Sequence, residues 1–466
     1  MNFSDLRFWL LLLLVLGVAL GGRAVATRLI PTHLRLYDHA ALACVNLALF
    51  FSADARSCAI LLTELLLTFW LIRVALRGGS ATRTACLGVL VLLHLAVLGY
   101  FKYSRFFIHD LFGYDWRYAP LGIPAGISFY TFQKLALAID TVRNDRPLPQ
   151  GFNFLNYNTF FPQLVAGPIE RRSHLLPQIE NFSLRPRLEN LERAVPLLVL
   201  GLFYKLVLAD NLAAFELRAL DANAYAIWLT NLLFGLRIYF DFCGYSTIAL
   251  GLARLFGVEL TVNFRAPYAA ASIREFWQRW HISLSTWFRD YLYIPMGGSR
   301  RGSHSLNLFV VFLVSGFWHG AGVNFLLWGA WHGLLMILNG WTGRLTGGWT
   351  RFVSRPLTLL CVLFSWLFFY EGNLRSLRAK VAATVNWHAY TPDFLKQVLA
   401  YYAAGDRVPL AFCLALALLF LAVEYRHRNR PNPCEPLLDW RVSCLLAFLL
   451  VLFTAGENSP FIYFAF

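Results

Sequence analysis

Charged residues are scarce in this sequence. Asp, Glu, Lys and Arg make up 14% of its 466 residues, whereas soluble domains carry roughly a quarter. Hydrophobic residues make up 58%, and the mean hydropathy is +0.53. So few charges cannot solvate the surface of several soluble domains, and the composition therefore excludes a soluble enzyme and a disordered chain. It predicts an integral membrane protein.

Paired cysteines and acidic residues are also scarce. The eight cysteines are scattered without a Cys-x-x-Cys pair, which indicates neither a secreted disulfide framework nor a metal site. Basic residues outnumber acidic ones by 41 to 26, a net charge of +15. Because Lys and Arg form short clusters between apolar runs, we expect cytosolic loops of a membrane protein and no nucleic-acid binding.

Apolar runs long enough to cross a bilayer recur along the chain. A crossing needs about 20 residues, with roughly 17 to 25 tolerated. We expect about 11 to 13 transmembrane helices, from eleven clear runs and a weaker twelfth at 40–53. The clear runs are 8–20, 58–72, 86–100, 121–139, 195–208, 226–240, 306–318, 325–338, 357–370, 410–423 and 442–453.

Basic clusters set the expected orientation. With about twelve crossings and both termini outside, every cluster falls on the cytosolic side, as the positive-inside rule requires. The clusters lie at 23–35, 73–83, 171–187, 265–301, 344–355 and 426–441. Two further apolar stretches, 151–170 and 242–260, would break this count. We expect both to be re-entrant segments lining a cavity, with plain crossings and a wrong count as the alternative.

The segment 273–291 has helical periodicity, with aromatic residues on one face and Arg279 on the other. It is too charged to span a membrane, so we expect an amphipathic helix at the cytosolic interface. His281 lies at the edge of the apolar face, one turn from Ser285. A functional histidine and a solvated boundary residue remain equal alternatives here. The aromatic residues include Trp277 and Trp280.

Two histidines stand in or beside apolar runs, His319 in GFWHGAG and His332 in GAWHG. Gly316, Gly320 and Gly322 flank His319 and allow backbone or substrate to approach closely. A buried, neutral imidazole accepts a proton from a hydroxyl or thiol, as a general base does. A structural histidine that bonds across helices is the alternative. For His332 we expect a supporting or packing role.

Other charges near apolar runs are candidates with equally simple explanations. Asp241 either orients a histidine or lies at the membrane interface. Glu170 either caps a re-entrant turn or also lies at the membrane interface. Arg171 and Arg172 follow a Gly-Pro break and are candidates for binding the phosphates of a donor, together with Arg279. Ordinary positive-inside charges explain these arginines as well.

Six segments resemble one family, the membrane-bound O-acyltransferases. The longest and most specific is NFRAPYAAASIREFWQRWHISLSTWFRDYLYIPMGG at 263–298. Within the family they resemble the branch that O-acetylates bacterial exopolysaccharides such as alginate and cellulose. The other segments are LGIPAGISFYTFQ (121–133), FFPQLVAGPIERRSHLLPQI (160–179), YFDFCGYSTIALGLARLFG (239–257), GFWHGAGVNFLLWGAWHG (316–333) and FSWLFFYEGN (364–373).

The resemblance implies an all-α ring of helices around a tunnel between a cytosolic and an outer funnel. The family's invariant histidine, deep in the membrane, corresponds to His319, and its second implicated histidine corresponds to His281. The single membrane domain is expected to comprise N-terminal helices (1–120), a catalytic core (121–373) and a periplasmic segment with C-terminal helices (374–466). Supporting or tunnel-lining candidates are His332, Asp241, Trp277, Trp280, Ser285, Trp318 and Asn324.

The resemblance also implies an activity and its partners. We expect acetyl transfer from cytosolic acetyl-CoA, with no bound cofactor, to a periplasmic accessory acetyltransferase and other polysaccharide modification proteins at the bacterial inner membrane. D-alanyl transfer from a carrier-protein thioester is an alternative within the family. A transporter and a non-enzymatic scaffold of the modification complex are alternatives outside it.

Overall fold

The structure is a computed structural model that describes residues 3–114, 122–217, 223–342, 348–402, 404–454 and 461–462. These residues form helices and no strand, which confirms the all-α class. They divide into two compact units. Unit 1 comprises Met1–Leu198 and Tyr245–Thr261, and unit 2 comprises Val199–Gly244 and Val262–Phe466. Residues 121 and 344, which fall in an expected crossing and an expected basic cluster, lie outside the described residues.

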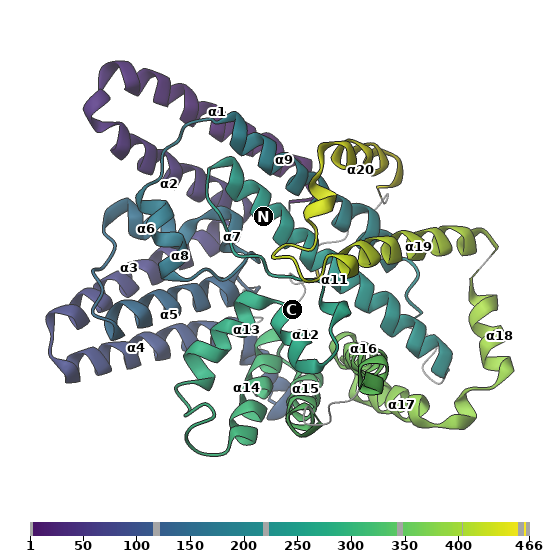
Figure 1. Cartoon of the computed structure of the whole chain (residues 1–466). Coiled ribbons are helices and arrows are strands. Elements are labelled where there is room, and N and C mark those ends of the chain that lie inside the picture. Colours follow the sequence, from purple (N-terminus) through teal and green to yellow (C-terminus); the bar gives the residue numbers. More distant parts are fainter. Residues whose placement is uncertain are drawn as a thin grey trace. The chain divides into compact units, whose positions relative to one another are not determined.

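Unit 1 consists mainly of apolar helices that pack against their neighbours in the chain. In Figure 1, α1 packs on α2, α3 on α4, and α4 on α5. The Asp54 side chain accepts the first N–H groups of α3 and thereby caps it. The helices are α1 (Leu6–Leu29), α2 (Leu34–Ala53), α3 (Ala55–Arg77), α4 (Ser80–Leu98), α5 (Ile127–Arg143), α6 (Gly151–Thr159), α7 (Phe161–Leu164), α8 (Arg172–Glu180) and the first part of α9 (Leu188–Phe203).

Unit 2 holds the helices that carry all three candidate histidines. Its closest helix pair is α14 and α15, which are joined by a short turn and lie side by side (Figure 1). The helices are α10 (Asp210–Ala213), α12 (Ile273–Arg279), α13 (Ile282–Phe288), α14 (His304–His319), α15 (Val323–Thr342), α16 (Gly348–Tyr370), α17 (Leu374–Val385), α18 (Pro392–Tyr401), α19 (Ala404–Arg426) and α20 (Trp440–Phe453).

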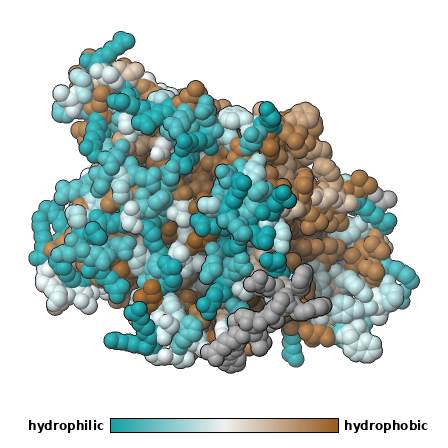
Figure 2. All heavy atoms as spheres, viewed as in Figure 1, coloured by the Kyte–Doolittle hydropathy of each residue, from teal (hydrophilic) through white to brown (hydrophobic). Residues whose placement is uncertain are grey.

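Eight helical segments among the described residues are long and apolar enough to cross a membrane. They correspond to α1, α2, α3, α4, α9 with its continuation, α11 (Ala224–Leu255), α16 and α19, whereas α14 and α20 are shorter apolar helices. All twelve expected runs fall largely on helical residues, so the multi-pass character is confirmed. Figure 2 shows apolar side chains, in brown, on the surface over α19 and α20. Exposed apolar surface of this kind faces lipid in a membrane protein.

The re-entrant reading of 242–260 is wrong. Residues 242–255 continue α11, a helix of 32 residues. Two polar residues of this part of the helix, Ser246 and Thr247, are buried inside the protein. In contrast, the 151–170 stretch is broken as expected, into α6 and α7, and its residues are largely buried. Whether it enters the membrane and returns remains a prediction.

The expected continuity of the helix over 273–291 is also wrong, whereas its place at the cytosolic interface stays a prediction. The segment forms α12 and α13, followed by a π-helical turn at Arg289–Tyr293. The break falls at His281, whose φ is +43°, in the left-handed region. The Asn263 carbonyl accepts the Ile282 N–H at 3.0 Å, and the Asn263 side chain accepts the Ser283 N–H at 3.1 Å. These bonds hold the break, and they bury His281 instead of leaving it at an interface.

Candidate active site

His319 is the last residue of α14 and is buried by aromatic rings. Its ring centroid lies 5.0 Å from that of Trp328 on α15 and 5.4 Å from that of Phe369 on α16, both at steep angles. Trp318 packs on it from the preceding position, at 5.0 Å. Only 3% of His319 is exposed. The imidazole therefore lies in an apolar surround.

Glycines on α14 and α15 determine how closely this histidine approaches its neighbours. A Cβ atom at Gly316 would collide with the Phe325 carbonyl oxygen and would lie 3.0 Å from the Gly329 Cα. A Cβ atom at Gly329 would collide with the Phe312 carbonyl oxygen. The two backbones thus touch where both residues lack a side chain, as small residues permit in membrane helix pairs. This contact sets the distance between His319 and Trp328.

His281 faces the same aromatic core from the break between α12 and α13. It is fully buried, with its ring 4.7 Å from that of Phe242 and 6.2 Å from that of Trp318. Trp318 therefore contacts both candidate catalytic histidines. Burial away from water lowers the pKa of His281 to about 3. Its imidazole is neutral at physiological pH.

His332 on α15 has a defined hydrogen-bond partner. The Trp277 indole N–H donates to its Nδ1 at 3.3 Å, and the Trp328 ring lies 4.7 Å away. An indole N–H only donates, so Nδ1 must hold a lone pair, and a neutral ring then carries its proton on Nε2. Trp277 and Trp328 also contact one another at 5.6 Å. Tryptophan rings thus connect His332 with His319.

The sequence matches known proteins at the segments that build this core. Residues 61–377 match the family described as MBOAT, membrane-bound O-acyltransferase family. "Probable alginate O-acetylase AlgI" of Pseudomonas putida is 34% identical over 441 residues, which cover 86% of this chain and 89% of that protein. "Peptidoglycan O-acetyltransferase" of Helicobacter pylori is 30% identical over 431 residues and 81% of each chain.

The chain belongs to the membrane-bound O-acyltransferase family. This confirms the resemblance and the enzyme class: the protein is a multi-pass membrane O-acyltransferase. A "Teichoic acid D-alanyltransferase" of Streptococcus thermophilus is also similar, at 32% identity over 235 residues, which cover 46% of this chain and 56% of that protein. Transfer of an acyl group to oxygen is thus the chemistry that the site must perform.

A groove of about 470 Å³ in unit 2 lies beside the aromatic core of the acyltransferase. Trp277 and Phe312 line its inner side, and Trp277 contacts His332. Arg274 and His304 line it as well, so apolar and basic groups meet in one groove. Ser285, a predicted site residue, lines the same groove, and its hydroxyl donates to the Trp280 carbonyl at 3.3 Å. We name this the unit 2 groove.

Three other predicted tunnel residues have structural partners in the acyltransferase. Asp241 accepts hydrogen bonds from Lys205 Nζ at 2.7 Å and from the Ile462 N–H at 2.8 Å, and whether it orients a histidine stays a prediction. The Asn324 side chain donates to the Phe368 carbonyl at 3.0 Å and so links α15 to α16. Trp280 packs on the ring of Trp366, at 5.2 Å.

The predicted donor-binding arginines also have structural contacts. Arg279 pairs with Glu275 at 2.7 Å and donates to the carbonyl groups of Arg265 and Arg428. In unit 1, Arg172 donates to the Pro147 carbonyl at 2.6 Å, and Arg171 precedes α8 as its N-terminal boundary. Their role in donor binding remains a prediction.

Glu170, beside these arginines, connects two segments of unit 1. It is fully buried, accepts the Thr261 N–H at 2.5 Å and contacts His174 Nδ1 at 2.6 Å. This hydrogen bond with the carboxylate raises the pKa of His174. Glu170 therefore joins the segment before α8 to the residues that follow α11, and its role in capping a re-entrant turn stays a prediction.

Several buried charged groups were missed by the sequence analysis. In unit 1, Lys134 pairs with Glu64 at 2.6 Å, and His94 Nδ1 contacts the other Glu64 oxygen at 3.1 Å. In unit 2, Glu424 accepts hydrogen bonds from two tyrosines, Tyr204 and Tyr239, at 2.9 and 2.6 Å. Glu64 and Lys134 stand inside expected crossings, and an ionisable residue at membrane depth is a signal that would have found them.

Proposed function

We propose that this O-acyltransferase moves an acetyl group from cytosolic acetyl-CoA to a hydroxyl that arrives from the outer side of the bacterial inner membrane. In this proposal the acceptor belongs to a periplasmic accessory acetyltransferase or to the polymer itself, and the end product is an O-acetylated exopolysaccharide. The observation that carries the proposal is His319, an imidazole buried among aromatic rings at a glycine-lined helix contact.

In the proposed reaction His319 acts as general base. Its imidazole takes the proton of the acceptor hydroxyl while the oxygen attacks the thioester carbonyl carbon. The new carbon–oxygen bond forms as the carbon–sulfur bond breaks. The imidazolium then returns the proton to the leaving thiolate, so the products are an ester and free coenzyme A thiol. An apolar surround supports this role because it keeps the imidazole neutral before the reaction.

The unit 2 groove supports a thioester donor with a charged, phosphate-bearing end. Arg274 offers positive charge to phosphates, while Ser285 and Gln278 offer polar contacts to the amide-containing arm. Trp277 and Phe312 form the apolar wall on the side of the histidines. In this arrangement His281, buried and neutral, lines the acyl path beside Trp318.

The named relatives support the outer half of the reaction. Two of the similar proteins are named for O-acetylation, of alginate and of peptidoglycan, both of which are polymers. D-alanyl transfer is the second candidate function, and the match to the D-alanyltransferase favours it over a smaller part of the chain. The basic residues of the unit 2 groove fit the phosphates of coenzyme A and of a carrier-protein prosthetic arm equally, so the test must distinguish these donors.

Acetyl transfer from labelled acetyl-CoA by the purified protein in lipid nanodiscs tests the proposal. We expect label to reach a co-reconstituted periplasmic acceptor with wild-type protein. His319→Ala should lower transfer roughly 10²- to 10⁴-fold, the contribution of a general base. His388→Ala, which removes an exposed histidine of unit 2, is the matched control and should transfer normally.

The outcomes separate the alternatives. Normal transfer by folded His319→Ala would refute the role of this histidine, and a scaffold would then explain the protein better. If wild type ignores acetyl-CoA but accepts a carrier-protein thioester, the D-alanyl alternative replaces the acetyl one. Movement of intact acetyl-CoA across the membrane by His319→Ala would indicate a transporter.

A further inference from the structure

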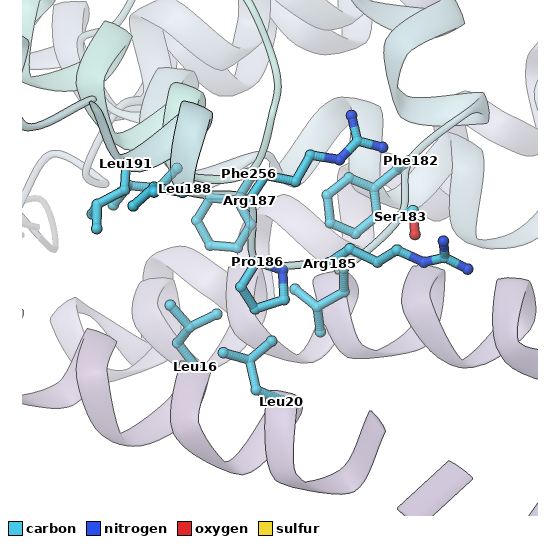
Figure 3. Close-up of a pocket in the computed structure, with 12 residues that line it drawn as sticks. Leu16, Leu20, Phe182, Ser183, Arg185, Pro186, Arg187, Leu188, Leu191 and Phe256 are labelled. Carbon is cyan, nitrogen blue, oxygen red and sulfur yellow. The ribbon is translucent and has the colours of Figure 1, made fainter. Parts of the chain in front are cut away.

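Unit 1 carries a groove that lies outside the acyl-transfer chemistry. It has a volume of about 380 Å³ and is formed by α1, by the loop before α9, by the first turn of α9 and by the residues at the end of α11. Leu16 and Leu20 of α1 line one wall, and Leu188 and Leu191 line another (Figure 3). Two arginines of the loop, Arg185 and Arg187, complete the lining, and Figure 3 shows their guanidinium groups extending toward the same side.

We propose that this groove, the unit 1 groove, binds an anionic glycerophospholipid. One acyl chain lies against the leucines, and the phosphate is held by Arg185 and Arg187. The proposal concerns binding of a membrane component and is independent of the acetyl-transfer proposal.

The charges around the unit 1 groove favour an anion. Arg185 and Arg187 are both exposed. The nearest acidic residue along the chain, Glu189, forms an ion pair with Arg193 at 2.6 Å. Asp38, which accepts a hydrogen bond from Ser183 in the groove lining, pairs with Arg23 at 2.7 Å. Because these carboxylates are already paired, the two arginines present net positive charge to whatever enters the groove. Two guanidinium groups are well suited to a phosphate.

The depth of the leucines fits an acyl chain below that phosphate. Along α1, Leu20 lies three residues before Arg23, and Leu16 lies seven residues before it. At 1.5 Å per residue these separations are roughly 5 and 10 Å along the helix axis. Arg23 belongs to a basic cluster that we place at the cytosolic headgroup level. Leu16 and Leu20 then lie in the hydrocarbon of the inner leaflet. Leu13 and Leu14, the preceding residues on α1, are exposed as on a lipid-facing surface.

An anionic lipid is favoured over a neutral one and over a soluble phosphate. The cytoplasmic leaflet carries the anionic lipids that basic residues attract. A neutral phospholipid would fill the apolar part of the groove but would gain less from two arginines. A soluble phosphate compound would use the arginines but leave the leucine wall without a function. The combination of both surfaces therefore selects a ligand with both parts.

Binding of phosphatidylglycerol and phosphatidylcholine to the full-length protein, measured by native mass spectrometry, tests the proposal. Each arginine near a membrane surface strengthens binding of an anionic lipid about fivefold. The double variant Arg185→Gln/Arg187→Gln should thus retain phosphatidylglycerol roughly 25-fold more weakly. Arg300→Gln/Arg301→Gln removes the same charge from an exposed loop of unit 2 and is the matched control.

A second variant tests the chain-binding wall. Leu20→Trp places a larger side chain in the groove and keeps both arginines, so a photoactivatable phosphatidylglycerol should lose its crosslinks to 16–20 and 182–191. Unchanged thermal unfolding of both groove variants would show that lost binding does not reflect lost folding. Three results would each overturn the proposal. The first is an equal loss of phosphatidylglycerol binding in the groove and control arginine variants. The second is retention of phosphatidylcholine equal to that of phosphatidylglycerol, and the third is displacement of the lipid by inorganic phosphate or coenzyme A.

Discussion

The glycine contact between α14 and α15 yields a sharp test of how the fold positions the candidate base. In Gly329→Ala the added methyl group has no space, because the Phe312 carbonyl oxygen occupies it and the Leu313 Cα lies 3.1 Å away. Both obstacles are backbone atoms, which cannot rotate aside. The helices must therefore separate, and Trp328, one residue before the glycine, must move relative to His319. A forced methyl group in a packed interior costs about 1 to 3 kcal/mol.

The expected effect on catalysis is larger than the effect on folding. A displacement of about 1 Å at a reacting group lowers the rate roughly 10²-fold. We therefore expect Gly329→Ala to fold with a lowered unfolding temperature and to transfer acetyl about 100 times more slowly. Both quantities are measured in detergent or nanodiscs, by thermal unfolding and by label transfer.

Gly340 on the same helix provides the control. A Cβ atom there has open space around it, and alanine favours a helix over glycine by about 0.5 to 1 kcal/mol. Gly340→Ala should leave activity unchanged and stability unchanged or raised. Wild-type activity in Gly329→Ala would refute the argument that this helix contact sets the geometry of His319. Equal loss of activity in both variants would refute it as well.

Three further predictions follow from the buried charges and the perturbed imidazoles. Lys134→Met should destabilise the fold by roughly 3 to 5 kcal/mol, because it leaves the Glu64 carboxylate buried with His94 as its remaining partner. The double variant Lys134→Met/Glu64→Gln should recover much of the lost stability. Because its bond with Glu170 raises the pKa of His174, this pair stabilises the fold below about pH 6.5 and loses that contribution as pH rises through the higher value. His174→Gln should remove that slope from unfolding measurements. Because burial lowers the pKa of His281 to about 3, the neutral imidazole is kept as pH falls, and the fold loses stability progressively from about pH 6.5 downward. His281→Gln should flatten this acid-side slope, and an unchanged slope would contradict the burial argument.

Hydropathy predicted the membrane helices because their lipid-facing sides must be apolar whatever their neighbours are. The count of crossings failed at 242–255, an apolar stretch that it set aside, because α11 continues there as part of one helix of 32 residues. There the helix packs against other protein: a Cβ atom at Gly244 would lie 2.9 Å from the Gly201 carbonyl oxygen. Because Ser246 and Thr247 are buried inside the protein, they do not have to be apolar. The count relied on the order of the basic clusters along the chain, and that order carries no information about which parts of a helix pack against protein.

Periodicity predicted the helical character of 273–291 but not its break. The pattern of aromatic residues continues through His281 without interruption, so nothing local marks the turn. What makes the turn is Asn263, which accepts two backbone N–H groups from the residues after His281. Such a bond between positions 20 residues apart depends on the tertiary structure. The pairing of Lys205 with Asp241, 36 positions apart, was unpredictable for the same reason.

The two Trp-His-Gly motifs show where sequence alone stops being informative about catalysis. Trp318-His319-Gly320 and Trp331-His332-Gly333 are identical as letters, and both histidines are buried. Their surroundings differ: the Trp277 indole donates to Nδ1 of His332, and an indole cannot accept a proton in return. In the resulting tautomer Nε2 already bears the proton, so a neutral His332 has no lone pair left with which to take one from a hydroxyl. It is therefore suited to hold Trp277 and, through Trp328, to position His319, which leaves His319 as the better candidate for the base. His332→Gln should accordingly lower the rate less than His319→Ala, because a positioning contact is weakened while the proton acceptor remains.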